Sequence, residues 1–207
     1  AAAIVELYTE DVKIFGSIEG LFEYLTELKS NAIVYFHNLK FDGAFWISYL
    51  LNELKFEQAY ETLVDTPESY VVKWLPISKM KNNTFKYAIS DKGMWYKIDI
   101  KVNNHLIQIR DSLKLLPFSV KKIGENFKTK HRKSSIEYKG YRYSGCEITD
   151  EEKQYIANDV LVVKEALEIM FQQGHNKLTI GSCCLEEFKS NFDKKDYTGA
   201  FPNLYDF

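Results

Sequence analysis

The sequence contains few cysteines and no long hydrophobic run. Cys146, Cys183 and Cys184 are its three cysteines, and they form neither a CxxC pair nor the Cys/His spacing of a zinc site. An odd number of cysteines argues against a disulfide framework, so we expect a reducing, cytosolic environment. The chain has no apolar run of 18 residues and no signal peptide. We therefore expect no transmembrane helix and no membrane partner.

An excess of charge of one sign is also missing. The chain carries 27 Lys and Arg against 29 Asp and Glu, a formal net charge of -2. This balance excludes a uniformly basic nucleic-acid binder, but it leaves room for a local basic groove. The 45% hydrophobic and 15% aromatic content is enough for a packed core. With 207 residues and no low-complexity linker, we expect a single domain over residues 1–207.

The hydrophobic pattern of the first half alternates between strands and helices. Two short alternating segments, AAAIVELYT and VKIFG, predict strands, and SIEGLFEYLTELKS has helical spacing. AIVYFHN predicts a fully buried strand, with a helix following from Gly43. A meander of strands is predicted by SYVVKWLPI, TFKYAIS, MWYKIDIKV and HLIQIRDS.

The second half is predicted to be helical. The basic segment LKLLPFSVKKIGENFKTKHRKSS is expected to be mostly helix. Thr149 and Glu152 form a capping box at the start of a long helix, for which Gly174 is a natural stop. Strands followed by helices, with one helix between early strands, predict an α/β domain with a central mixed β-sheet flanked by helices.

The segment YFHNLKFDGAFW places Asp42 just after a predicted buried strand. Burying an unpaired carboxylate costs several kcal/mol, so Asp42 must face water or a positive partner. Open α/β sheets bind ligands at the carboxyl ends of their strands, which makes Asp42 a candidate site residue. The alternative is that Asp42 caps the helix beginning at Gly43.

A second candidate is YIAND, in which Tyr155 and Asp159 are separated by one helical turn and share a face. If Asp42 and Asp159 converge, their oxygens suit Mg²⁺ or Mn²⁺. Two such ions stabilise the attacking and leaving oxygens of phosphodiester hydrolysis, and a nearby tyrosine hydroxyl could orient the water. The alternative is a solvated helix face with an intrahelical contact.

Two interpretations are open for each of several other polar and aromatic residues. His37 is either a site residue or a satisfied core histidine, and Phe41, Phe45 and Trp46 are either core or platforms for base stacking. A basic stretch is either a phosphate-contacting edge or an ordinary solvated surface. It consists of Lys114, Lys121, Lys122, Lys128, Lys130, Arg132 and Lys133.

Taken together, these segments resemble one known family. YFHNLKFDGAF is similar to the second exonuclease motif of the protein-primed family B DNA polymerases of phages and linear plasmids. YIAND is similar to their third motif, Tyr-x-x-x-Asp. Between the two motifs, RDSLKLLPFSVKKIGENFK resembles the family's Ser-Leu segment, and HRKSSIEY resembles its lysine-bearing loop. The resemblance implies a ribonuclease-H-like 3'-5' exonuclease domain.

The resemblance also implies roles for individual residues. Asp42 and Asp159 would bind Mg²⁺ or Mn²⁺ in a two-metal site, Tyr155 would orient the attacking water, and Lys133 would stabilise charge on the scissile phosphate. The implied partner is the 3' end of single-stranded DNA. The residues that would hold it are His37, Asn38, Phe41, Phe45, Ser112, Leu113 and Tyr138.

The sequence departs from the family at the first exonuclease motif, an Asp-x-Glu that supplies two further metal ligands. No residue before Asp42 forms this motif, and the Asp-x-Glu of residues 150–152 begins a helix. The polymerase motif Asp-x-x-Ser-Leu-Tyr-Pro is missing as well. We therefore expect an N-terminally truncated exonuclease domain with an incomplete metal site and weak or no cleavage.

Two functions follow from this comparison. The first is the proofreading exonuclease of a protein-primed polymerase, which would act with the polymerase domain and the terminal (primer) protein in the cytoplasm of a bacterial host. The second is a non-catalytic module, derived from that domain, that binds single-stranded DNA or protein. The joint presence of Asp42, Asp159, Tyr155 and Lys133 favours the nuclease.

Overall fold

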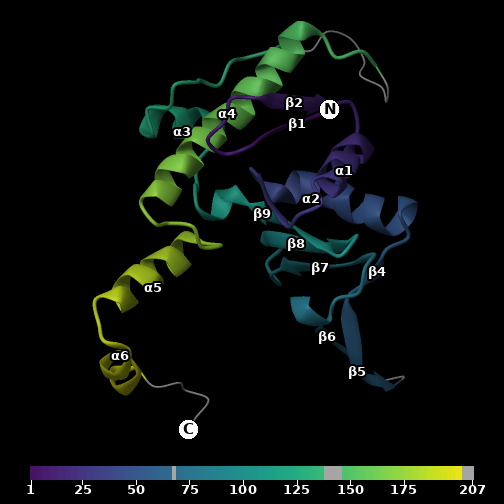
Figure 1. Cartoon of the computed structure of the whole chain (residues 1–207), viewed down its shortest axis with the longest axis vertical. Helices are drawn as coiled ribbons and strands as arrows, with labels where there is room; N and C mark the ends of the chain where they lie inside the picture. The colour runs from purple at the N-terminus through teal and green to yellow at the C-terminus, as the bar shows by residue number, and fades with distance from the viewer. Residues whose placement is uncertain (67–68, 138–145, 202–207) are drawn as a thin grey trace.

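A five-stranded mixed sheet lies at the centre of the computed structural model, which describes residues 1–66, 69–137 and 146–201 (Figure 1). Its strand order is β3-β9-β8-β7-β4. β3 runs parallel to β9, while β9, β8 and β7 form an antiparallel meander. The strands span Ala32–Phe36 (β3), Glu57–Gln58 (β4), Thr84–Ile89 (β7), Trp95–Val102 (β8) and His105–Asp111 (β9).

Two helices, α1 (Ile18–Glu27) and α2 (Leu39–Ser48), pack against this sheet, and α2 continues as a short π-helix, η1 (Tyr49–Glu53). Their apolar side chains meet those of the strands because alternate residues of β8 and β9 point to this face. This core includes Leu21, Leu25, Trp46, Leu50, Phe85, Ile98, Ile100, Ile107 and Ile109. This packing fixes α2, which carries Asp42, against the sheet.

A second core forms between α3 (Val120–Asn126) and the long helix α4 (Asp150–Gln172). It contains Leu115, Leu116, Ile123, Val162, Ala166 and Leu167. α4 also packs against β1 (Ala2–Val5), which pairs with β2 (Val12–Phe15) in a separate antiparallel sheet (Figure 1). Across the described ranges, no helix is both long enough and apolar enough to cross a membrane.

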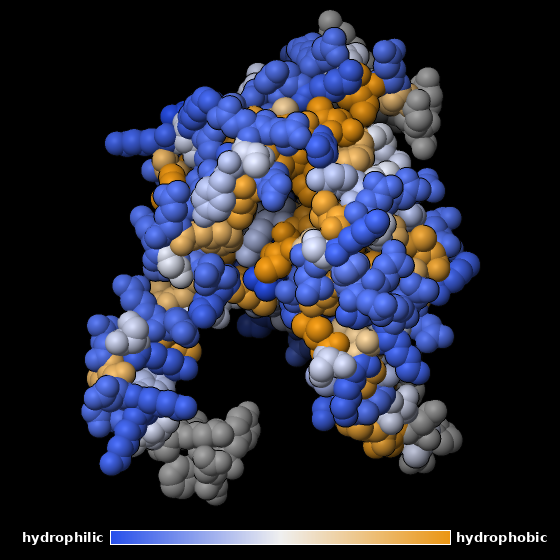
Figure 2. Space-filling view, in the orientation of Figure 1, coloured by the Kyte–Doolittle hydropathy of each residue, from blue (hydrophilic) through white to orange (hydrophobic). Residues whose placement is uncertain are grey.

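The remaining elements lie at the periphery. A hairpin of β5 (Tyr60–Thr66) and β6 (Ser69–Trp74) projects from one end of the sheet, and Figure 2 shows hydrophobic residues on its surface. A 3-10 turn, η2 (Ile77–Lys79), follows β6, and a second, η3 (Ser112–Lys114), follows β9. The chain ends with α5 (Ile180–Ser190) and α6 (Lys194–Ala200), which extend away from the sheets (Figure 1).

Most of the expected elements are confirmed. The predicted α/β class, the central mixed sheet and its flanking helices are present. The capping box at Thr149 and Glu152 forms as predicted, and Gly174 follows the end of α4 with a left-handed φ of 84°. The short strand β4 and the strand β5 were not predicted.

Four expectations were wrong. SYVVKWLPI forms β6, but this strand pairs with β5 in a separate two-stranded sheet and is not part of the predicted meander. The segment of residues 113–135 is not mostly helical, because α3 has seven residues and Lys128 adopts a left-handed conformation, φ 51°, soon after it. β3 is not fully buried, since Val34 alone is buried and the strand lies at an edge of the described sheet. The helix carrying Asp42 begins at Leu39 rather than Gly43, because Asn38 (φ 69°) turns the chain directly from strand to helix.

Candidate active site

The candidate site begins where β3 and β9 end side by side. These parallel strands are in register up to Phe36 and Asp111. Asp111 is 2% exposed, and its Oδ1 accepts hydrogen bonds from the backbone N–H groups of Asn38 and Leu113, each at 3.0 Å. One buried carboxylate therefore joins the turns that follow both strands, and this fixes the position of the segment that leads to Asp42.

His37 makes a second connection between these turns. Its Nε2 lies 2.8 Å from the carbonyl oxygen of Phe118, and its Nδ1 lies 3.0 Å from Ser112 Oγ. Because a carbonyl oxygen only accepts, Nε2 carries a hydrogen. Burial lowers the pKa of His37, although the charges of Asp111 and Asp159 act in the opposite direction. Both ring nitrogens thus have protein partners, as expected if His37 is a hydrogen-bonded structural histidine.

Asp42 lies in the first turn of α2 and is partly exposed. Loss of solvent raises the pKa of Asp42, and the negative charge of Asp111 raises it further. The alternative that Asp42 is a helix N-cap is wrong, since Asn38 occupies that position. Both effects make the ionised form of Asp42 less favourable, and a positive charge nearby would make it more favourable.

Gly43 determines how closely α2 approaches the sheet. A Cβ at this position would lie 2.4 Å from Cζ3 of Trp95 on β8. Real Cβ atoms do not approach other atoms so closely, so the contact requires glycine. The adjacent Asp42 is thereby held close to the end of the sheet.

Lys133, Tyr155 and Asp159 come together on the other side of the site. Lys133 Nζ donates to Tyr155 Oη at 3.0 Å and to Asp159 Oδ2 at 2.6 Å. Burial alone would lower the pKa of Lys133, but its hydrogen bonds to Asp159 and Tyr155 outweigh burial, and the pKa is raised. Tyr155 and Asp159 share one face of α4, as their spacing predicted. Asp159 bonds to a residue 26 positions away rather than making the intrahelical contact of the alternative.

The second oxygen of Asp159 is unusual. Oδ1 is buried, and it has no hydrogen-bond partner within the described part of the chain. A buried carboxylate oxygen without a partner costs free energy, and a bound cation removes that cost. This oxygen therefore fits a divalent metal ion, as does the choice of a carboxylate ligand.

The described residues hold no group of three or more His, Cys, Asp and Glu side chains that could bind a metal. No hydrogen bond or ion pair joins Asp42 to Asp159 among the described residues, although the charge of Asp111 acts on residues beside both. Asp111 affects the pKa of Asp42, while Asp111, Asp159 and Lys133 all affect that of His37. Sequence reasoning missed Asp111, whose only local signal is its place at the end of a predicted strand.

The predicted DNA-holding residues are of three kinds. Phe41 and Phe45 are 74% and 69% exposed, so the core alternative is wrong for both, whereas Trp46 is core at 1% exposed. Ser112 is fully buried, and its hydroxyl lies between His37 and the carbonyl oxygen of Phe36. The backbone N–H groups of Asn38 and Leu113 donate to Asp111. Tyr138 lies outside the described residues.

The basic stretch is mostly solvated. Lys121, Lys122, Lys128 and Lys130 are exposed, which agrees with the ordinary-surface alternative for these residues. Lys114 differs, because its Nζ lies 3.9 Å from Asp111 Oδ2 and 5.1 Å from the centre of the Tyr96 ring.

Comparison with known proteins gives consistent matches. Residues 26–147 match the family model for DNA polymerase type B, organellar and viral. The chain is 37% identical over 201 residues to the DNA polymerase of Bacillus phage B103 and 39% identical over 204 residues to that of Bacillus phage phi29. Each alignment covers 94% of this chain and 31% of the relative, so the chain spans about a third of these polymerases.

The fold agrees with solved structures of one of these relatives. Phi29 DNA polymerase complexed with primer-template DNA superimposes with a TM-score of 0.76 and 37% identity, covering 94% of this chain and 32% of that one. The same polymerase complexed with single-stranded DNA gives a TM-score of 0.73 over 91% of this chain and 31% of that one. Fold and sequence therefore lead to the same group of proteins.

Proposed function

The chain belongs to the type B DNA polymerases of organelles and viruses, and we propose that it is the 3'-5' proofreading exonuclease domain of a protein-primed member. Its reaction would be hydrolysis of the 3'-terminal phosphodiester of single-stranded DNA. The observation that carries this proposal is that Lys133 bonds to both Tyr155 and Asp159, whose buried second oxygen has no partner among the residues that the structure describes. A helix that served packing alone would not need this set of groups.

Asp42 and Asp159 are the proposed ligands of Mg²⁺ or Mn²⁺. Bound there, the metal would stabilise the charge that develops on the phosphate oxygens. The buried Oδ1 of Asp159 supports this assignment, because it has no hydrogen-bond partner among the described residues. Mg²⁺ is often held by one or two carboxylates, with water and substrate phosphates completing its shell. Two protein carboxylates are therefore compatible with a cation that binds together with DNA.

Lys133 and Tyr155 have complementary roles in this proposal. The ammonium group of Lys133 would face the scissile phosphate and offset the negative charge of the transition state. Because Lys133 donates to the Tyr155 oxygen, the phenolic hydrogen of Tyr155 remains available. Tyr155 would donate this hydrogen to the attacking water and so orient it.

The exposed rings of α2 would hold the DNA. Phe41 and Phe45 are one helical turn apart and point to solvent beside Asp42, so bases can stack on either. His37, Asn38 and Leu113 would line the same groove, while buried Ser112 would act by fixing His37. Tyr138 keeps the role that the family resemblance implies. The likeness to a polymerase complexed with single-stranded DNA supports this class of ligand.

The wider setting is part of the proposal. The relatives are phage DNA polymerases about three times as long as this chain, so the domain would work beside a polymerase domain. The family resemblance adds the terminal protein as a proposed partner. Replication of a phage or mobile element would place it in the cytoplasm of the bacterial host.

A non-catalytic module that binds single-stranded DNA is the second candidate. The observation in its favour is that the described residues contain no cluster of three metal-binding side chains. An exonuclease assay separates the two functions. The chain is incubated with a 5'-labelled single-stranded oligonucleotide and Mn²⁺, beside Asp42→Asn and Asp159→Asn. Stepwise shortening that both substitutions abolish supports the nuclease, whereas binding without shortening supports the module.

A further inference from the structure

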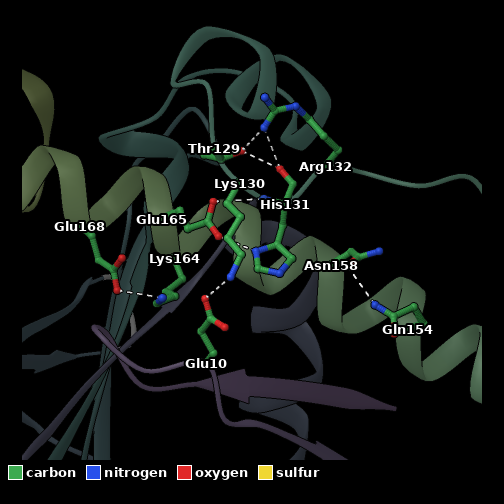
Figure 3. Close-up of polar contacts among 10 residues, drawn as sticks. All are labelled: Glu10, Thr129, Lys130, His131, Arg132, Gln154, Asn158, Lys164, Glu165 and Glu168. Atoms are coloured by element: carbon green, nitrogen blue, oxygen red, sulfur yellow. Dashed lines mark hydrogen bonds and ion pairs between the residues drawn. The ribbon is translucent and has the colours of Figure 1, made fainter.

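The loop that carries Lys133 is held in shape by its own residues. Thr129 is 3% exposed, and its hydroxyl donates to the carbonyl oxygen of His131 at 2.8 Å. Arg132 Nη1 donates to Thr129 Oγ1 at 3.1 Å and to the same carbonyl at 3.0 Å (Figure 3). These contacts close the loop on itself, but they do not connect it to the helix that carries Tyr155 and Asp159.

That connection is made by Glu165 of α4. Its Oε1 lies 2.5 Å from His131 Nδ1, and its Oε2 accepts from the His131 backbone N–H at 3.3 Å (Figure 3). Because a carboxylate oxygen only accepts, Nδ1 carries a hydrogen. One carboxylate therefore holds both the main chain and the side chain of His131. The side chains are 23% and 14% exposed, so water competes weakly for these bonds.

A neighbouring ion pair provides a contrast. Lys130 Nζ lies 2.6 Å from Glu10 Oε1, which belongs to the connection between β1 and β2 (Figure 3). These side chains are 68% and 63% exposed, and water and salt screen exposed pairs so that they add little to stability. The Lys130 pair therefore holds the loop weakly, and the partly buried His131 pair is the stronger attachment.

We propose that His131 and Glu165 are positioning residues that set Lys133 against Tyr155 and Asp159. This inference rests on the proposed function of Lys133. Glu165 lies roughly two turns beyond Asp159 on the same helix. The contacts of His131 and Lys133 are thus both made to α4. Lysine has a flexible four-carbon stem, and residues 134–137 after Lys133 have no regular secondary structure. A fixed backbone two residues earlier is what restricts the reach of Nζ.

Lysine reactivity measures this positioning without metal or DNA. The chain is treated briefly with an acetylating reagent, and the rate at Lys133 is measured by mass spectrometry relative to exposed Lys121. His131→Ala and Glu165→Ala should each raise the relative rate at Lys133 about tenfold, because bonds to charged groups are lost. The double variant should show no further increase, and Glu165→Gln, which keeps one acceptor oxygen, should be intermediate.

Two controls make the result specific. Lys164 is 8% exposed and pairs with Glu168 on the same helix, so its continued protection shows that α4 is intact. Lys153→Ala removes an exposed charge from α4 and should leave Lys133 unchanged. An unchanged acetylation rate at Lys133 in both His131→Ala and Glu165→Ala overturns the positioning role. An equal rise in the acetylation rates of Lys133 and Lys164 also overturns it, because α4 itself would then be disturbed.

Cleavage of single-stranded DNA then tests the link to function. His131→Ala should lower the single-turnover rate and leave the Kd for DNA unchanged. It should have no additional effect when Lys133 is already alanine. A further loss in that background contradicts action through Lys133. If the acetylation rate at Lys133 rises in His131→Ala and Glu165→Ala but cleavage is unchanged in these variants and in Lys133→Ala, the proposed role of Lys133 in cleavage is wrong. The positioning role of His131 and Glu165 is then still supported.

Discussion

Lys133 and Asp159 form a 2.6 Å ion pair across 26 residues of sequence, and the other oxygen of Asp159 has no hydrogen-bond partner in the described part of the chain. The pair brings a loop cation to the face of α4 that also carries Tyr155. One carboxylate thus has two different oxygens, one satisfied by the protein and one available to a ligand.

Lys133→Ala should slow cleavage much more than it weakens DNA binding. If Lys133 acts on charge that develops during the reaction, its loss should lower kcat by about 10²–10³-fold. Single-turnover kinetics with a labelled oligonucleotide and fluorescence anisotropy measure the two quantities. A large increase in Kd with an unchanged rate would make Lys133 a simple phosphate contact.

Phe41→Ala should weaken single-stranded DNA binding by about 1–3 kcal/mol if a base stacks on the ring. Since Phe41 is 74% exposed, its removal should hardly change the unfolding temperature. Trp46→Ala is the matched control, because Trp46 is 1% exposed and its loss should cost about 3–5 kcal/mol of stability. Unchanged anisotropy for Phe41→Ala would remove this ring from the DNA surface.

Gly43→Ala should destabilise the protein even though alanine favours helices. The new methyl group would meet the Trp95 ring at 2.4 Å, and such overpacking costs about 1–3 kcal/mol. Urea unfolding measures the loss. Trp95→Leu should tolerate alanine at position 43 better, so a Gly43→Ala penalty that is the same in both backgrounds would show that the ring contact is not its cause.

Stability should fall as the solution is acidified below about pH 6.5, and His37 should contribute to this fall. Burial lowers the pKa of His37 from its ordinary value of 6.5, so the unfolded chain binds a proton at a higher pH than the folded chain. The contribution of neutral His37 is therefore complete above that pH and is lost as the pH falls through the folded pKa.

Thermal unfolding of wild type and His37→Gln between pH 5 and 8 measures this contribution. The variant should lose part of the wild-type slope, and Lys153→Ala, an exposed substitution on α4, should keep it. Equal slopes in His37→Gln and wild type would contradict the prediction.

The sequence predicted the site residues whose environment is set locally. The helical spacing of Tyr155 and Asp159, and the capping box at Thr149, depend on neighbours within one turn, so their shared face could be predicted. The strand before Asp42 was predicted too, but its burial was not, because an apolar run does not distinguish an edge strand from a central one.

Contacts between residues far apart in the sequence could not be predicted from local patterns. Asp111 becomes important only because β3 and β9 pair in parallel and bring its carboxylate to Asn38. The His131–Glu165 contact likewise depends on how the loop after α3 meets α4. The basic segment before this loop has a helical composition, but the turn at Lys128 ends the helix early. Composition alone could not predict that turn.

Binding of Mn²⁺ tests the central claim most directly, because it requires the two aspartates and no catalysis. Electron paramagnetic resonance measures free Mn²⁺ during titration of the chain in the presence of a single-stranded oligonucleotide that carries a non-hydrolysable 3'-terminal linkage. We predict saturable binding that Asp42→Asn and Asp159→Asn each weaken by at least about tenfold, while Asp150→Asn, an exposed carboxylate on the same helix as Asp159, leaves it unchanged. Equal Mn²⁺ affinity in wild type, Asp42→Asn and Asp159→Asn would contradict the account.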